Sequence, residues 1–337
     1  MPVDRRNSST VAITGATGLL GGALVRQLLA AGFSAASLRC LVRSRERAER
    51  SGIPPESIVL GALEDAESLE RATEGAEVVF HLAATLKARS RAAFDAVNAR
   101  GTEALIAAMR RRAPGARLVL VSSLAAAGPS VDGRASARMP GECRPVSHYG
   151  ESKRQGELAL LAHRDLPWTI VRPPVVYGAG DAATRLLFQQ ARALFTFVPR
   201  SDAPLSIVHV DDVARALVAT VDDRASGAIL PLDGPERTTT HAMLQAFAAA
   251  CGRRARLVPV PLAVAAAAAR LAEFGAGLFG RTSFFNPDKV REIAASGWVA
   301  DGAHIRALLG FAPEVDLATG LRAVARAEGL LPGHDRA

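Results

Sequence analysis

Residues 10–29, TVAITGATGLLGGALVRQLL, contain the pattern that decides the fold. A short β-branched run, typical of a buried strand, leads into Gly15, Gly18 and Gly21, spaced G-x-x-G-x-x-G, and a helical pattern follows. Glycines at such a turn let the backbone approach a pyrophosphate, which then binds to the free N–H groups of the helix N-terminus. Glycine-rich turns are common, so the pattern indicates dinucleotide binding because it lies between a strand and a helix.

The same alternation of strand and helix continues through the first 230 residues. Apolar runs without polar alternation, as in strands covered on both faces, recur along this part of the chain. These runs lie at residues 10–14, 37–42, 57–61, 77–83, 117–123 and 168–173. Their order predicts an α/β fold with a doubly wound parallel sheet of the Rossmann type.

The domain organisation follows from where this alternation stops. A chain of 337 residues exceeds the usual size of one domain. We predict a dinucleotide-binding domain at residues 8–173, to which 205–230 returns. Residues 174–204 and 231–330 are predicted to form a smaller, mostly helical substrate-binding lobe.

The composition excludes several classes of function. The chain has 41 Lys and Arg against 33 Asp and Glu, but the arginines are scattered among acids and few aromatic residues accompany them for base stacking. We therefore expect no nucleic-acid partner. The three cysteines are isolated, with no C-x-x-C pair and no histidine at metal-ligand spacing, so we expect no metal site and a reduced, cytoplasmic compartment.

Residues 261–280 are the stretch to be tested as a membrane element. Alanine is only weakly apolar, and Arg270 and Glu273 lie mid-segment, where each would be costly in a bilayer. We expect no stable membrane insertion and interpret the stretch as a packed helix. Two alternatives stay open, a membrane-surface role and one wall of a hydrophobic substrate pocket. The phenylalanines that would form this wall are Phe274, Phe279, Phe284 and Phe285.

The end of the second predicted strand bears on the choice between NAD and NADP. Folds that select NAD place a carboxylate there, about 20 residues past the glycine loop, to bind the ribose 2′-OH. No acid occurs between Gly32 and Glu46, and Arg39 and Arg43 are present instead. Arg43 at the strand tip could bind a 2′-phosphate in a bidentate way, which favours NADP and leaves NAD open. The alternative is that both arginines lie on a solvated surface.

A candidate catalytic group lies in residues 147–157, SHYGESKRQGE, where Tyr149 precedes Lys153 by four positions in a chain with only three lysines. On a helix these side chains share one face. The ammonium can stabilise a phenolate, lower its pKa and hydrogen-bond the ribose of a cofactor. Ser122 and Ser123, at the end of the fifth strand, supply a hydroxyl that can polarise a carbonyl oxygen, although such hydroxyls also cap helices.

These residues carry a resemblance to a known family. The motifs TGATGLLG, VNARGT, LVLVSS, YGESK, VRPPVVYG and IVHVDDVARA occur in order over nearly the whole chain, which resembles an extended short-chain dehydrogenase/reductase, similar to the NAD-dependent epimerase/dehydratases. RPPVVYG and the arginine pair are most similar to the 3β-hydroxysteroid dehydrogenase and dihydroflavonol reductase type. The resemblance implies that Ser123 is the catalytic serine, Tyr149 the acid/base and Lys153 its partner.

The resemblance also completes the set of expected cofactor-binding residues. Together with those already named, the set is Gly15, Thr17, Gly18, Leu19, Leu20, Gly21, Arg39, Arg43, Ala62, Leu63, Leu82, Ala83, Ala84, Tyr149, Lys153, Pro173, Val175 and Val176. One position departs from the family, because Ala62 stands where its members have an adenine-contacting Asp. We expect weaker or rearranged adenine contacts.

Two other functions are weighed against these residues. By the resemblance, a nucleotide-sugar epimerase would hold the substrate diphosphate with an Asn and an Arg, whose places are taken by Val175 or Pro174 and by Leu205. A non-catalytic cofactor-binding subunit would tolerate losing the Ser, Tyr and Lys that this chain keeps. We therefore predict an NAD(P)-dependent oxidoreductase that transfers a hydride between nicotinamide and a carbonyl or secondary alcohol of a largely apolar small molecule. That molecule is the expected partner, and a homodimer is left open as the assembly.

Overall fold

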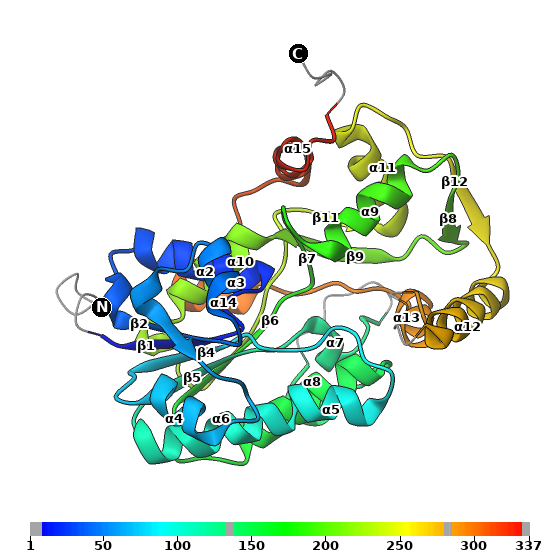
Figure 1. Cartoon of the computed structure of the whole chain (residues 1–337). Helices are drawn as coiled ribbons and strands as arrows, with labels where there is room; N and C mark the ends of the chain where they lie inside the picture. The colour runs from blue at the N-terminus through cyan, green and yellow to red at the C-terminus, as the bar shows by residue number, and fades with distance from the viewer. Residues whose placement is uncertain (1–8, 132–137, 280–282, 284, 332–337) are drawn as a thin grey trace.

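The structure is a computed structural model that describes residues 9–131, 138–279, 283 and 285–331. A layered α/β unit forms its larger part, and a smaller part with short strands and helices lies beside it (Figure 1). Phe284, predicted as a pocket residue, lies outside the described residues.

The larger part is built on a seven-stranded sheet in the order β10-β6-β5-β4-β1-β2-β3, in which all neighbours pair in parallel. Its strands are β1 Val11–Thr14, β2 Leu38–Val42, β3 Ile58–Leu60, β4 Val78–His81, β5 Arg117–Val121, β6 Trp168–Arg172 and β10 Ala228–Pro231. The prediction of six strands from apolar runs is confirmed, because each run contains one of them. The edge strand β10 was not predicted.

Helices cover both faces of this sheet (Figure 1). On one face, Leu24, Val213 and Ile305 pack with strand residues in one hydrophobic core, and on the other Leu69, Leu105 and Leu160 do the same. The helices of the first face are α2 Leu19–Ala30, α3 Arg45–Arg50, α10 Val210–Ala219 and α14 Ala303–Leu309, and those of the second are α4 Ala66–Thr73, α5 Arg91–Asn98, α6 Arg100–Arg112 and α8 His148–Leu161. The one-turn helix α7, Leu124–Ala127, follows β5. The fold class predicted from the sequence is confirmed.

The smaller part contains two small sheets as well as helices. One sheet has the order β11-β9-β7, and in the other β12 pairs with β8. The strands are β7 Val175–Tyr177, β8 Thr196–Pro199, β9 Pro204–His209, β11 Arg237–Thr239 and β12 Leu257–Val260, and the helices are α9 Ala182–Arg192, α11 Thr240–Ala250, α12 Leu262–Leu278, α13 Pro287–Ile293 and α15 Leu317–Ala327. Short 3-10 helices lie at Ala35–Ser37, Pro55–Ser57, Pro140–Glu142 and Asp223–Ala225. Phe188, Phe247 and Leu321 form the centre of its core.

Segment 205–230 divides between the two parts. Strand β9 belongs to the three-stranded sheet, whereas α10 packs on α2 and β10 extends the main sheet beside β6. The chain therefore passes from the main sheet into the smaller part after β6, and it returns to the main sheet after β9.

The prediction that residues 261–280 form a packed helix is wrong for most of its surface. Helix α12 is present, but Ala269 is its only buried residue. Phe274 and Phe279, which the pocket alternative would place in a wall, are 69% and 80% exposed. The neighbour that α12 contacts most is the short helix α13, which is too small to cover it. No helix among the described residues is long and apolar enough to cross a membrane.

Candidate active site

The glycine loop joins β1 directly to the N-terminus of α2. Gly15 has φ +76°, and a Cβ there would lie 2.6 Å from the backbone nitrogen of Ala83, so only glycine fits. Helix α2 begins after Gly18, and no side chain caps its N-terminus. Its first-turn N–H groups therefore have no side-chain acceptor and can bind an anion. These residues fit the pyrophosphate of a dinucleotide.

The segment of Leu82, Ala83 and Ala84 lies beside this loop. The backbone nitrogen of Leu82 donates to the carbonyl of Thr14 at 3.1 Å, and that of Ala83 donates to the Thr14 hydroxyl at 3.3 Å. These bonds hold the segment against the start of the glycine loop.

Asn98 connects the segment after β4 to α8 by hydrogen bonds. Its carboxamide oxygen accepts from the backbone nitrogen of Thr85 at 2.8 Å, and its nitrogen donates to the Ser152 hydroxyl at 2.9 Å. Ser152 lies between Tyr149 and Lys153 in the chain. Asn98 was not predicted as a site residue, although it lies in the VNARGT motif, which was the available signal.

Helix α8 brings Tyr149 against Ser123. The helix starts at the cap Ser147, whose side chain accepts from the backbone nitrogen of Gly150 at 3.0 Å. A Cβ at Gly150 would lie 2.4 Å from the carbonyl oxygen of Ala125, so glycine here lets α8 pack directly on α7. The Ser123 side chain caps α7 by accepting from the nitrogen of Ala125 at 3.1 Å, and it lies near enough to the Tyr149 phenol to lower the pKa of that phenol. The two interpretations of Ser123, as a hydroxyl that polarises a carbonyl and as a helix cap, are therefore compatible.

Lys153 lies one helical turn after Tyr149 on α8 and is buried, with 4% of its surface exposed. Its Nζ donates to the carbonyl oxygen of Val121, the last residue of β5, at 2.7 Å. Burial lowers the pKa of Lys153 to about 8, and the nearby Glu157 carboxylate opposes this shift. An ammonium with a pKa in this range can change its charge near neutral pH.

Burial also dominates the acidity of Tyr149. It raises the pKa of the phenol to about 12, while the hydrogen bond from Ser123 lowers that pKa and the charge of Glu292 raises it. We expected Lys153 to lower the pKa of Tyr149. In the chain by itself desolvation is the larger effect, so the phenol stays protonated at neutral pH.

A buried ion pair fixes α8 on the main sheet. Glu157 of α8 accepts from Nε of Arg172 at 2.8 Å and from its second terminal nitrogen at 2.6 Å, and neither side chain is exposed. Arg172 ends β6 and also donates to the carbonyl of Arg138 at 2.6 Å. Because both charges are buried and paired in a bidentate way, the position of α8 relative to β6 is well determined.

Two carboxylates of α13 hold the N-terminus of α8. Asp288 accepts from the backbone nitrogen of His148 at 2.8 and 3.1 Å and from that of Tyr149 at 3.5 Å. Glu292 accepts from the Ser147 hydroxyl at 2.7 Å. Negative charge at a helix N-terminus stabilises that terminus. Sequence reasoning missed both acids, and no local signal marks them because they lie about 140 residues from their partners.

The structure separates the two arginines at the second strand. Arg43 directly follows β2 at its carboxyl end, is exposed, and makes no hydrogen bond or ion pair with any described residue. Arg39 lies near the start of β2 and donates to the carbonyls of Glu74 and, at 3.4 Å, Arg71. The expectation that Arg39 binds cofactor does not fit this geometry, because its guanidinium is held by the end of α4.

The Ser68 side chain and α6 hold Ala62 and Leu63, the residues that were expected near the adenine. The Ser68 hydroxyl bonds both the nitrogen and the carbonyl oxygen of Ala62 at 3.2 Å, and Leu63 packs against Gly101. On the nicotinamide side, the carbonyl of Pro173 accepts from the nitrogen of Leu124 at 2.9 Å, next to Ser123. Val175 is 37% exposed at the start of β7, and Val176 packs in a small cluster with Leu19 and Leu20.

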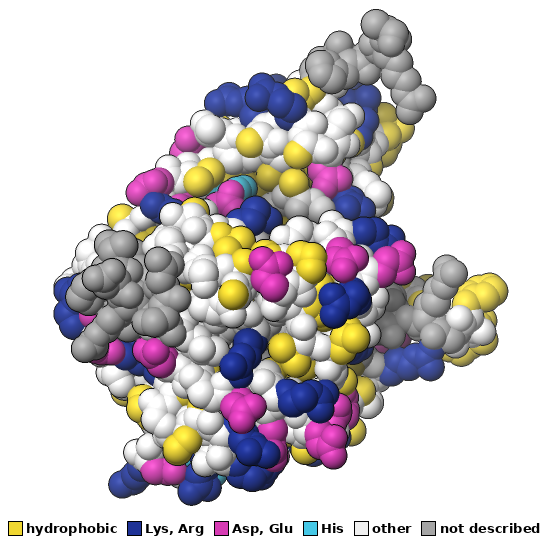
Figure 2. Space-filling view, turned by 60° about the vertical axis from the view of Figure 1, so that its left-hand side comes forward, with side chains coloured by type: hydrophobic (Ala, Val, Ile, Leu, Met, Phe, Trp, Pro, Cys, Tyr) yellow, Lys and Arg dark blue, Asp and Glu magenta, His cyan; other side chains and the backbone are white. Residues whose placement is uncertain are grey.

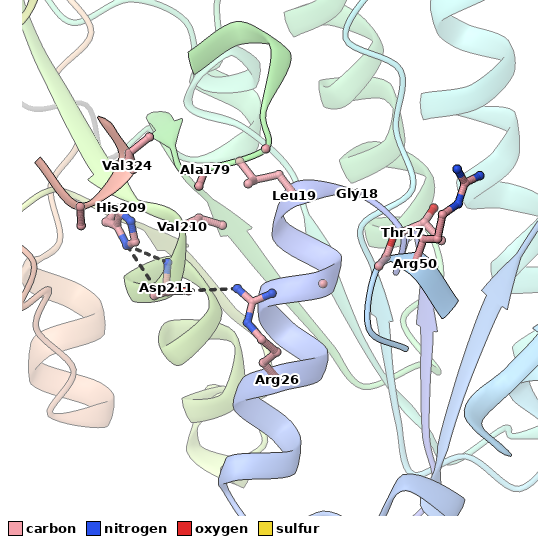
Figure 3. Close-up of a pocket in the computed structure, with 14 residues that line it drawn as sticks. Thr17, Gly18, Leu19, Arg26, Arg50, Ala179, His209, Val210, Asp211 and Val324 are labelled. Carbon is pink, nitrogen blue, oxygen red and sulfur yellow. Dashed lines mark hydrogen bonds and ion pairs between the residues drawn. The ribbon is translucent and has the colours of Figure 1, made fainter. Parts of the chain in front are cut away.

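A cavity of about 500 Å³ lies between the start of α2, the start of α10 and α15 (Figure 3). Thr17, Gly18 and Leu19 line it on the glycine-loop side. Arg26 reaches from α2 to Asp211 of α10, 3.5 Å away. The cavity touches the expected pyrophosphate loop but none of the three catalytic candidates.

Comparisons with known proteins agree with this geometry. The model of the NAD dependent epimerase/dehydratase family matches residues 11–230. The ceramide reductase of Caulobacter vibrioides is 35% identical over 312 residues, which are 90% of this chain and 89% of that protein. The 4-hydroxy-2-methyl-3-oxo-4-farnesyl-3,4-dihydroquinoline-1-oxide ketoreductase of Stigmatella aurantiaca is 30% identical over 322 residues, or 88% and 94% of the two chains.

Among solved structures, the UDP-glucose 4-epimerase of Thermus thermophilus in complex with NAD superposes with a TM-score of 0.73 over 96% of this chain and all of that one, at 23% identity. This likeness supports the fold alone. With the glycine loop, the parallel sheet and the two reductase relatives, the chain belongs to the NAD dependent epimerase/dehydratase family, within the extended short-chain dehydrogenase/reductases, and is an NAD(P)-dependent enzyme.

Proposed function

We propose that this enzyme transfers a hydride between NADP(H) and a carbonyl or secondary alcohol of a largely apolar small molecule, and that Ser123, Tyr149 and Lys153 carry out the catalysis. The observation that carries the proposal is that Ser123 lies near enough to Tyr149 to lower the pKa of its phenol, with the buried Lys153 one turn further along α8. This group stands at the carboxyl end of β5, two strands from the glycine loop. Ligands of open α/β sheets bind at that edge.

Each of the three side chains has a role that its position supports. The Ser123 hydroxyl donates to the substrate oxygen on which negative charge develops. Tyr149, protonated at neutral pH, gives its phenolic proton to that oxygen during reduction and removes it during oxidation. Lys153 supplies positive charge from the same helix face and an ammonium that can bind ribose hydroxyls. The cofactor supplies or accepts the hydride.

The residues that would hold this cofactor are contributed by three regions. The first turn of α2 takes the pyrophosphate, and the segment from Leu82 to Ala84 lines its path. Pro173, Val175 and Val176 flank the nicotinamide. Arg43, exposed at the tip of β2, would bind a 2′-phosphate, and for this reason we propose NADP in preference to NAD. Arg39 is left out of the proposed site.

An apolar substrate is supported by two observations. The position at which the resemblance expects an anion-binding Arg is Leu205, which is 6% exposed and packs in the core of the smaller part. The two reductase relatives are named for ceramide and for a farnesyl-substituted quinoline, both largely apolar. We take residues 174–204 and 231–330, apart from α14, which packs on the main sheet, as the lobe that binds this substrate.

The proposal is tested with a panel of lipophilic ketones, long-chain keto-amides, sterol ketones and nucleotide sugars. NADPH consumption is the readout for the carbonyl compounds, and chromatography of the products is the readout for the nucleotide sugars, because epimerisation consumes no net cofactor. We expect turnover of one lipophilic class and its loss in Tyr149→Phe. His163→Phe, a change outside the site, serves as the matched control and should keep the activity. Turnover confined to a nucleotide sugar, with bound NAD regenerated, would replace this proposal with an epimerase.

A further inference from the structure

Helix α12 turns its apolar face away from the protein. Leu271, Phe274 and Leu278 are 73%, 69% and 70% exposed. At 100° per residue these side chains fall on one face of the helix together with Val264, whereas the buried Ala269 falls on the opposite face. A surface helix of a globular protein normally has the reverse arrangement. An exposed apolar face of this kind marks an interaction site.

The exposed apolar surface continues along neighbouring elements. Leu194, Phe195 and Phe197, in and before β8, are 69%, 50% and 69% exposed. Strand β8 pairs with β12, which leads through Pro261 into α12. Figure 1 shows β8, β12 and α12 following one another at the right-hand edge. We call residues 194–197 and 262–279 together the apolar edge.

Positive charge is concentrated around the apolar edge. Residues 182–201 and 242–272 contain no Asp or Glu, and they carry seven of the arginines. These are Arg185, Arg192, Arg200, Arg253, Arg254, Arg256 and Arg270, of which Arg185 is paired with Glu328 at 3.0 Å and the other six remain for the edge. Since the net charge of the whole chain is +8, the remaining residues are close to neutral. The arginines in these two segments are therefore not scattered among acids, as we expected for the chain as a whole.

The arginines lie at the ends of the same elements. Arg253 donates to the backbone carbonyl of Arg192 at 3.5 Å, which places the segments that precede β12 and β8 side by side. Arg200 directly follows β8, and Arg270 is exposed within α12. Figure 2 shows a projection on the right-hand side with hydrophobic side chains at its end and Lys or Arg side chains below them.

We propose that the apolar edge binds the surface of a lipid bilayer that contains anionic lipid. Helix α12 lies in the interface with Leu271, Phe274 and Leu278 among the acyl chains, and the arginines contact the headgroup phosphates. Interfacial helices combine an apolar face with flanking cations in this way. The proposal does not depend on the proposed reaction, since binding is measured without substrate or cofactor.

The charge distribution favours a bilayer over a second copy of the chain. A two-fold interface brings the same surface of both copies together. Here it would oppose two sets of arginines, which outnumber the adjoining acids Asp202 and Glu273, and like charges repel. Anionic headgroups neutralise the same arginines. Bound in this way, the edge would lie one helix from the catalytic site, because α13 contacts both α12 and the start of α8.

The test is co-sedimentation of the full chain with vesicles of phosphatidylcholine alone or mixed with phosphatidylglycerol. We expect binding to the mixed vesicles that weakens with salt. The triple variant Leu271→Glu, Phe274→Glu, Leu278→Glu should lose it, whereas Leu60→Glu, at an exposed leucine of the main sheet, should bind like wild type. The double variant Arg253→Ser, Arg254→Ser should bind mixed vesicles about thirtyfold more weakly, from roughly 1 kcal/mol per surface cation.

Folding of each variant is checked by thermal unfolding and by NADPH titration, which the apolar edge should not affect. Failure of wild type to bind mixed vesicles, or equal binding by the triple variant, would overturn the proposal. A wild-type dimer in sedimentation velocity that the triple variant abolishes, without vesicle binding, would assign the edge to a second copy instead. Because ketone turnover is measured separately, a failure of the proposed reaction leaves these outcomes unchanged.

Discussion

Lys153→Met should make the protein more stable while removing its function. Burial lowers the pKa of Lys153 from 10.5 to about 8, and one pKa unit corresponds to about 1.36 kcal/mol. The buried ammonium therefore costs the folded state about 3 kcal/mol at neutral pH. Methionine removes this cost and also the bond to the Val121 carbonyl, which contributes roughly 1.5 kcal/mol. We expect a net gain of about 1 to 2 kcal/mol in the free energy of unfolding at pH 7.

The gain should depend on pH in a defined direction. Between pH 8 and 10.5 the unfolded lysine binds more protons than the folded one, so the wild-type stability rises with pH in this window relative to the variant. The difference between the two proteins therefore shrinks as the pH approaches 10.5. Urea unfolding of the cofactor-free proteins at pH 7 and pH 10 measures it.

The control for this experiment is Lys87→Met, at an exposed lysine, which should differ from wild type by less than about 0.5 kcal/mol at both pH values. A Lys153→Met protein that is less stable than wild type at pH 7, or a difference unaffected by pH, would refute the reasoning. It would mean that Lys153 is held by favourable interactions and is not a strained group kept for catalysis.

Four other predictions test separate parts of the site. Arg43→Ala should weaken NADPH binding about ten- to a hundredfold and leave NADH binding unchanged, from one charge-assisted contact to the 2′-phosphate, whereas Arg39→Ala should change neither in fluorescence titrations. UDP- and dTDP-sugars should show no saturable binding below about 10 μM by calorimetry, about −7 kcal/mol, because the expected diphosphate positions are apolar. Asp288→Asn should lower kcat about fivefold without changing cofactor affinity, since about 1 kcal/mol of helix capping is lost. Glu292→Gln should lower the pKa of Tyr149, because the carboxylate charge raises it in wild type. As the pH rises, the reduction rate of this variant should therefore begin to fall at a lower pH than that of wild type.

The contradicting results are distinct, and for Asp288→Asn the contradicting result is a wild-type kcat. Equal loss of NADPH affinity in both arginine variants would place the 2′-phosphate elsewhere. Saturable binding of a nucleotide sugar would restore the epimerase alternative. An unchanged pH–rate profile in Glu292→Gln would show that this carboxylate does not act on the phenol.

Much of the main sheet could be predicted because its strands are covered on both faces and are therefore continuous apolar runs. The glycine loop and the pair Tyr149 and Lys153 could be recognised for a similar reason, since a local turn and a helical spacing are visible in sequence. Strand β10 could not be separated from the loops around it, because it is a four-residue edge strand. Apart from β9, the strands of the two small sheets also have only three or four residues.

The features that were missed depend on contacts between distant segments. Arg39 and Arg43 are four residues apart, and only the register of β2 shows that one faces α4 while the other lies at the tip. Asp288 reaches the start of α8 across 140 residues, which no local pattern records. The pKa of Tyr149 depends on burial that several elements create together. The apolar face of α12 was assigned to packing because an apolar helix is normally covered.

The measurement that tests the central claim most directly is steady-state kinetics of Tyr149→Phe, with cofactor titration, on the ketone that the panel identifies. This change removes only the hydroxyl that meets Ser123. We predict that kcat falls by about 10² to 10⁴-fold while NADPH affinity stays within about twofold of wild type. A Tyr149→Phe enzyme that keeps the wild-type kcat would contradict the account and place the proton transfer at another residue.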